Sequence, residues 1–142
     1  MKKIVLFISI VALAVSLNSC SSDGSGNGDT VSFKVNGVQK NFNVNTEEDT
    51  GYLFVTGHGT ADNSNESIEL SIYPASDSNV NPIEHFYYSK PDEVNGSYII
   101  ISNLTSRTSH SASGTFSGSI TGSSNSEDLI ITEGIFSLSA NR

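Results

Sequence analysis

The sequence predicts an all-β fold, an antiparallel β-sandwich of about eight strands, with a small closed barrel of the lipocalin type as the alternative. Short segments in which apolar and polar residues alternate recur along the chain, and clusters of Gly, Ser and Asn separate them. No window shows helical periodicity with capping residues. A two-residue period is common to sandwiches and barrels, so it does not distinguish between them.

The first two predicted strands form a hairpin around Asn36-Gly37, which lies between two alternating runs. Both residues of a tight hairpin turn need positive φ, which Asn and Gly adopt most readily. A two-residue loop places Lys40 opposite Phe33, on an otherwise apolar face. We expect the stem of Lys40 to lie along Phe33 while its ammonium group reaches water at a sheet edge.

The other predicted strands are short apolar or alternating segments bounded by turn residues. Ile68, Leu70 and Ile72, for example, alternate with polar residues until Pro74 ends the run, because proline cannot donate to a β-ladder. Together, the predicted strands span residues 31–35, 38–44, 51–61, 68–72, 83–89, 96–104, 114–121 and 129–140.

The last predicted strand changes parity along its length. Leu129 and Ile131 share one face, whereas Phe136 lies on the other. A β-bulge inserts one extra residue into a strand and is the simplest device that shifts parity in this way. We therefore expect a bulge at Glu133-Gly134.

The beginning of the chain has the pattern of a secretory leader. Lys2 and Lys3 precede an uncharged apolar run over residues 4–17, and a polar segment follows Cys20. The run is shorter than the roughly 20 residues that cross a bilayer, which favours cleavage over a membrane span. The predicted organisation is a signal peptide at 1–19, Cys20 with a flexible Gly/Ser/Asn tether to residue 29, and one all-β domain at 30–142.

Leu17-Asn18-Ser19-Cys20 resembles the lipobox of bacterial lipoproteins. The resemblance implies cleavage after Ser19, a diacylglyceryl group on the Cys20 thiol, and a fatty acyl chain such as palmitate on the new amino group. Cys20 is the only cysteine of the chain, so no intramolecular disulfide can form. Two or more acyl chains attach a protein durably to a membrane. The sequence therefore predicts anchoring to a membrane through Cys20.

Two further segments resemble the last hairpin of small Bacteroidota lipoproteins of unknown function. They are SGTFSGSI at 113–120 and LIITEGIFSL at 129–138. The resemblance implies an all-β domain at the outer membrane, on either its periplasmic or its extracellular face. It carries over no catalytic residue, because no chemistry is assigned to that family.

The charge balance restricts the partners of the protein. Without residues 1–19 the chain has five Lys or Arg against fifteen Asp or Glu, a formal net charge of −10. Such a surface repels polyanions, which excludes nucleic acid as a partner. The chain after the tether is long enough for one hydrophobic core and too short for two domains of typical size.

No pattern in the sequence predicts a metal, a cofactor or a catalytic set. His58, His85 and His110 lack the spacing of known ligand motifs. The segment 77–81 copies the start of a calcium loop, but Pro82 stands where that loop requires Gly. There is no G-x-S-x-G elbow, and the paired carboxylates lie in loops.

Two positions stand out as candidate contact or modification sites. Tyr87 and Tyr88 are adjacent in a predicted strand, so they point to opposite faces and one of them is a candidate platform for a glycan or a peptide. Asp29-Thr30-Val31 resembles the acceptor of an O-glycosylation system of Bacteroidota, which implies a sugar on Thr30.

These observations favour a non-catalytic, lipid-anchored envelope protein whose β domain is a structural module or binds a protein or glycan. One alternative is a small hydrolase or metal-dependent enzyme, which would need distant His, Asp and Ser residues to converge. The other is a lipocalin-like carrier, which would need a closed barrel with an open interior.

Overall fold

The structure is a computed structural model that describes residues 28–77, 81–91, 95–122 and 127–140. This part of the chain contains eight strands and one short 3₁₀ turn, η1 (Ala61–Asn63), so the all-β prediction is confirmed. The strands are β1 (Thr30–Val35), β2 (Val38–Asp49), β3 (Tyr52–Gly59), β4 (Ser67–Ile72), β5 (Ile83–Ser89), β6 (Asn95–Arg107), β7 (Ser111–Gly122) and β8 (Leu129–Ser139).

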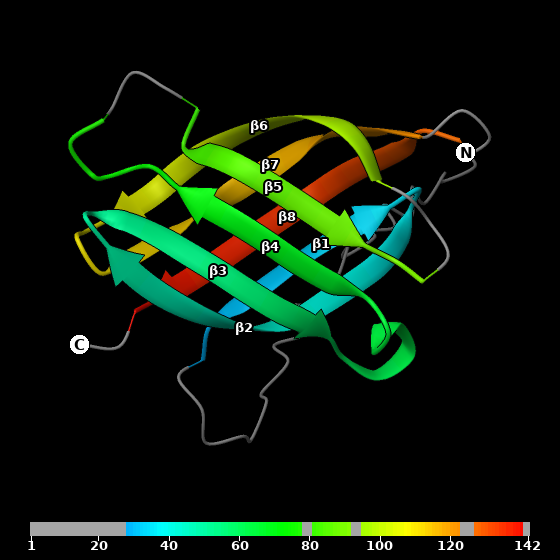
Figure 1. Cartoon of the computed structure of the whole chain (residues 1–142), viewed down its shortest axis with the longest axis horizontal. Coiled ribbons are helices and arrows are strands. Elements are labelled where there is room, and N and C mark those ends of the chain that lie inside the picture. The colour runs from blue at the N-terminus through cyan, green and yellow to red at the C-terminus, as the bar shows by residue number, and fades with distance from the viewer. Residues whose placement is uncertain (1–27, 78–80, 92–94, 123–126, 141–142) are drawn as a thin grey trace, which may run out of the picture.

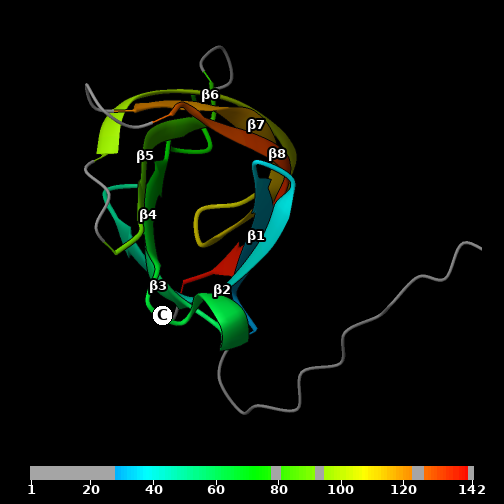
Figure 2. The ribbon, with the colours of Figure 1, turned by 90° about the vertical axis from the view of Figure 1, so that its right-hand side faces the viewer.

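All eight strands belong to one antiparallel sheet with the order β5-β4-β3-β2-β1-β8-β7-β6. β1 joins the two halves of the sheet by pairing with both β2 and β8, and the sheet curls until its end strands meet, which gives a nearly closed barrel (Figures 1 and 2). Of the two architectures left open by the sequence, the barrel is therefore the one that forms. The two ends of the sheet, β5 and β6, meet without a β-ladder between their described residues. We call this junction the seam.

The first hairpin forms as predicted. Asn36 and Gly37 have φ values of 48° and 82°, and Phe33 pairs with Lys40 in the expected register. The environment predicted for Lys40 is wrong, because β2 is flanked by β1 and β3 and is not an edge. Its Nζ lies 2.5 Å from Oε1 of Glu66, and the two side chains are only 14% and 8% exposed.

The predicted bulge in β8 is confirmed. The register of β8 shifts against β7 and against β1 near Glu133, whose φ is 53°. Gly134 follows it, and a Cβ at this position would meet the ring of Phe116 at 2.6 Å. Glycine is therefore required here because an aromatic ring packs directly on the backbone of β8.

The interior of the barrel is filled by side chains, mainly aromatic ones. The Phe33 ring lies 5.2 Å from that of Phe42, 5.5 Å from that of Tyr88 and 5.6 Å from that of Phe116, centroid to centroid. These rings are almost completely buried. An eight-stranded barrel has an interior just wide enough for such packing, so this core holds the curved sheet together.

The predicted signal peptide, Cys20 and most of the predicted tether lie outside the described residues. Among the residues that the structure describes, no helix has the length and apolarity needed to cross a membrane.

Candidate functional site

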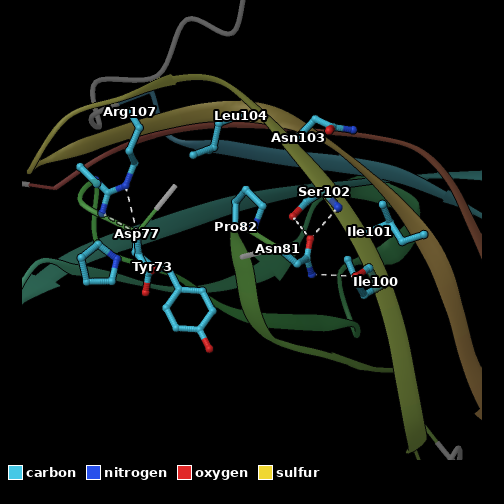
Figure 3. Close-up of a pocket in the computed structure, with 12 residues that line it drawn as sticks. Tyr73, Asp77, Asn81, Pro82, Ile100, Ile101, Ser102, Asn103, Leu104 and Arg107 are labelled. Carbon is cyan, nitrogen blue, oxygen red and sulfur yellow. Dashed lines mark hydrogen bonds between the residues drawn. The ribbon is translucent and has the colours of Figure 1, made fainter. Parts of the chain in front are cut away.

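A cleft lies where the seam opens. It has a volume of about 540 Å³ and lies between the end of β6 and the connection from β4 to β5 (Figure 3). Tyr73, Pro74 and Pro82 form the side that belongs to this connection, and Leu104 and Arg107 form the side that belongs to β6. This volume is in the range typical of ligand pockets, about 300–1,000 Å³.

Asn81 bridges the seam at one end of the cleft. Its Nδ2 donates to the carbonyl oxygens of Ile83, at the start of β5, and of Ile100 in β6, both at 2.8 Å. Its Oδ1 accepts from the main-chain N–H of Ser102 at 2.8 Å and from the hydroxyl of that residue at 2.6 Å (Figure 3). One side-chain amide thus connects the two ends of the sheet.

Two more side chains strengthen the seam where no backbone ladder exists. The hydroxyl of Ser102 accepts a hydrogen bond from the N–H of Ile83 at 3.0 Å. Nearer the start of β6, the hydroxyl of Tyr98 donates to the carbonyl of Glu84 at 3.3 Å. Buried backbone groups must find partners, and at the seam these partners are side chains.

Arg107 closes the other end of the cleft. Its Nη2 donates to the carbonyls of Gly51 at 2.7 Å and Tyr73 at 3.1 Å, and its Nη1 donates to that of Ser111 at 3.2 Å. Burial lowers the pKa of the Arg107 guanidinium, and the carboxylate of Glu48 opposes this effect. Arginine remains charged at neutral pH. This cation is therefore held by carbonyl oxygens from the turn between β2 and β3, from the residue that follows β4 and from the first residue of β7.

An aromatic row runs from the cleft onto the outer face of β3. The ring of Tyr73, which lines the cleft, lies 5.7 Å from that of Tyr52, and the Tyr52 ring lies 6.0 Å from that of Phe54. Desolvation, and then the carboxylate of Glu84, raise the pKa of Tyr73 above its ordinary value.

The structure places the two predicted platform residues in different environments. Tyr88 points into the barrel and is fully buried against Phe33 and Phe42. Tyr87 points outward and is 41% exposed. Only Tyr87 therefore presents its ring to solvent, and it is not among the residues that line the seam cleft.

The three histidines lie apart. His58 is on β3, the Nδ1 of His85 lies 3.4 Å from the hydroxyl of Tyr98, and the Nδ1 of His110 lies 3.7 Å from a carboxylate oxygen of Glu48. Within the described ranges, no group of three or more His, Cys, Asp or Glu side chains is arranged to hold a metal ion.

Thr30 is exposed at the first position of β1, beside Asp29, whose Oδ1 accepts from the N–H of Ser139 at 2.8 Å. Residues 78–80 of the calcium-like segment lie outside the described residues. The amide of Asn81, at the end of that segment, is engaged with the backbone of β5 and β6.

No family model, no curated protein and no solved structure matches this chain. Sequence reasoning missed Asn81 and Ser102, because nothing in a period-two pattern marks the residues that join strands without a ladder. Arg107 carried one signal, since it is the only charged residue between positions 95 and 109.

The chemistry available in the cleft is hydrogen bonding and apolar contact. The side chains of Asn81, Ser102 and Arg107 are already bonded to the protein backbone. These three side chains bound the cleft. The remaining lining comes from the connection between β4 and β5 and from β6, namely Tyr73, Pro74, Ala75, Asp77, Pro82, Ile100, Ile101, Asn103 and Leu104.

Proposed function

We propose that this protein is a lipid-anchored, non-catalytic binding module of the cell envelope, and that the seam cleft is its binding site. The observation that carries the proposal is the engagement of Asn81, Ser102 and Arg107 with the backbone around an open cleft. Side chains that are tied to carbonyl and amide groups on both sides of a cleft hold a rigid shape, which suits recognition.

The anchor in this proposal is Cys20, acylated after removal of residues 1–19, at the outer membrane. The lipobox-like LNSC sequence and the single cysteine support it. The Gly/Ser/Asn tether would let the barrel move about its anchor by roughly 5–6 Å times the square root of the tether length. A partner protein or glycan in the periplasm or outside the cell would thus be within reach.

The alternatives lack an observation of this kind. A carrier needs an open barrel interior, and here aromatic side chains occupy it. A hydrolase or metal enzyme needs convergent reactive groups, and the three histidines lie in different regions of the described structure.

The intact mass of the native protein extracted from membranes tests the anchor. We expect a chain that begins at Cys20 and carries the added mass of its acyl chains, and a Cys20→Ala variant that lacks this mass and leaves the membrane fraction. Protease treatment of whole cells then decides the face, because only an externally displayed domain is cleaved. A native chain without acyl mass would overturn the anchoring proposal.

A further inference from the structure

We infer that the free edge of β6 next to Asn103 binds an extended peptide segment of a partner protein by main-chain hydrogen bonds. This inference rests on the proposed function, because it names the ligand class of the seam cleft. The occupant would lie as an added strand between the end of β6 and the connection that follows β4.

The two strands at the seam differ in length. β5 has 7 residues and β6 has 13. The N–H of Ile83, the first residue of β5, bonds to the side chain of Ser102. β6 therefore continues past the beginning of β5 for five residues, from Asn103 to Arg107. Asn103, Leu104 and Arg107 of this extension line the cleft (Figure 3).

The direction of the free backbone groups follows from the pairing of Asn81. The carbonyl of Ile100 and the N–H of Ser102 both point to the seam, where they meet the amide of Asn81. Backbone groups repeat every two residues along a strand. The carbonyl of Ser102 and the N–H of Leu104 therefore point to the same side, and no described residue across the seam bonds to either group.

Asn81 shows what kind of group this edge accepts. Its side-chain amide donates to one carbonyl and accepts from the N–H two residues further on, as the N–H and C=O of one residue in a parallel neighbouring strand do. The carbonyl of Ser102 and the N–H of Leu104 repeat that arrangement one step along β6, inside the cleft. A peptide backbone supplies the matching donor and acceptor at the matching interval.

Two common edge protections are absent from the part of β6 that precedes its register shift against β7, which lies between Leu104 and Ser106. Natural edge strands often carry Lys or Pro that prevent pairing, and residues 95–107 contain neither. Leu104 is 38% exposed, and Pro74 and Pro82 offer apolar contacts to alternate side chains of an added strand. The formal net charge of −8 disfavours acidic segments. We therefore expect an uncharged or basic peptide with small apolar residues at alternate positions.

The test uses the detergent-solubilised native protein and a labelled, acetylated and amidated hexapeptide, Lys-Thr-Val-Thr-Val-Lys. Fluorescence anisotropy measures its affinity, and hydrogen exchange measures the amides of residues 102–106. We expect binding that slows exchange in this segment. We also expect a peptide N-methylated at its four central residues to bind at least about tenfold more weakly, because it cannot donate to the edge.

Two substitutions of one residue provide the matched variants. Leu104→Pro removes the N–H that faces the seam and should weaken binding about tenfold, whereas Leu104→Ala keeps the N–H and should stay within about threefold. If the proline variant does not fold, the exchange experiment on the native protein still decides whether the peptide pairs with the edge of β6. Absence of hexapeptide binding to the folded protein, or equal binding of the N-methylated peptide, would overturn the inference.

A third probe separates this inference from the proposed function. Cellohexaose that binds in the cleft, with an affinity unchanged by Leu104→Pro, would assign the site to a neutral glycan. The peptide inference would then be wrong while the binding module stands. Absence of acyl mass on Cys20 would instead contradict the anchoring proposal. It would not change the result of the peptide-binding experiment at β6.

Discussion

The Oδ1 atom of Asn81 accepts hydrogen bonds from both the N–H and the hydroxyl of Ser102, at 2.8 and 2.6 Å. The two residues lie 21 positions apart and belong to opposite sides of the seam. The hydroxyl of Ser102 in turn accepts from the N–H of Ile83 at the start of β5. A network of side chains therefore joins the two strands at this junction, whereas backbone ladders join neighbouring strands around the rest of the barrel.

Asn81→Ala should destabilise the domain by about 1–2 kcal/mol, because it leaves the carbonyl of Ile100 and the N–H of Ser102 without their protein partner. Water replaces part of this loss, since Asn81 is exposed. Urea unfolding followed by circular dichroism measures the change. Asn103→Ala, in the exposed part of β6, is the matched control and should change stability by less than about 0.5 kcal/mol. Equal effects of the two variants would show that the seam network is dispensable.

Two Lys–Glu pairs of similar length should differ strongly in their importance for stability. Lys40→Met removes the partner of Glu66, whose second carboxylate oxygen is buried without a hydrogen bond among the described residues. Breaking a buried pair in this way should cost about 3 kcal/mol.

The exposed pair Lys34–Glu133, at 2.7 Å, provides the comparison. Lys34→Met should cost less than about 1 kcal/mol, because solvent screens both charges. Chemical denaturation of both variants in one buffer gives the difference. If the two values agree within error, burial does not determine the contribution of these pairs.

Phe33→Ala should destabilise the protein by about 3–5 kcal/mol, since this fully buried ring contacts four other aromatic rings. Phe33→Leu keeps much of the volume and should cost about half as much. Phe54→Ala, at a ring that is 44% exposed, should cost no more than about 1 kcal/mol. Thermal unfolding ranks the three variants, and an equal loss for Phe33→Ala and Phe54→Ala would contradict a packed interior.

The raised pKa of Tyr73 predicts a pH dependence of stability. The folded-state pKa lies above the unfolded-state value of 10.0, so the fold favours the neutral phenol. This contribution is fully present below the unfolded-state pKa and is lost as the pH rises through the folded-state pKa. Urea midpoints of the wild type should therefore fall more steeply above pH 10 than those of Tyr73→Phe. Tyr87→Phe controls for the loss of one tyrosine, and parallel curves for wild type and Tyr73→Phe would refute the assignment.

Local features of the fold could be predicted from the sequence because their causes lie within a few residues. Asn36-Gly37 determines the first hairpin and its register, since both residues adopt positive φ. The parity change around Glu133-Gly134 predicts the bulge of β8, because one inserted residue shifts the alternation of side chains. The existence of eight strands follows from alternation and turn residues, whereas β2 and β6 extend beyond their predicted ends, to Asp49 and Arg107.

The candidate site could not be predicted, because it depends on how distant segments meet. The sequence predicts that Tyr87 and Tyr88 point to opposite faces, but only the curvature of the sheet decides that Tyr88 is buried and Tyr87 exposed. The environment of Lys40 depends on Glu66, which is 26 residues away in the chain. Nothing near either residue predicts this contact.

From its amino-acid order alone, the chain specifies strands, turns, a bulge and an acidic balance, and it predicts a signal peptide over residues 1–19. Tertiary structure decides that β1 pairs with β8, that the single sheet closes into a barrel filled by aromatic rings, and that β5 and β6 meet without a ladder. The reason is physical. Alternation orients each side chain relative to its own strand, whereas the choice of neighbouring strand depends on packing and hydrogen bonds across the whole sheet.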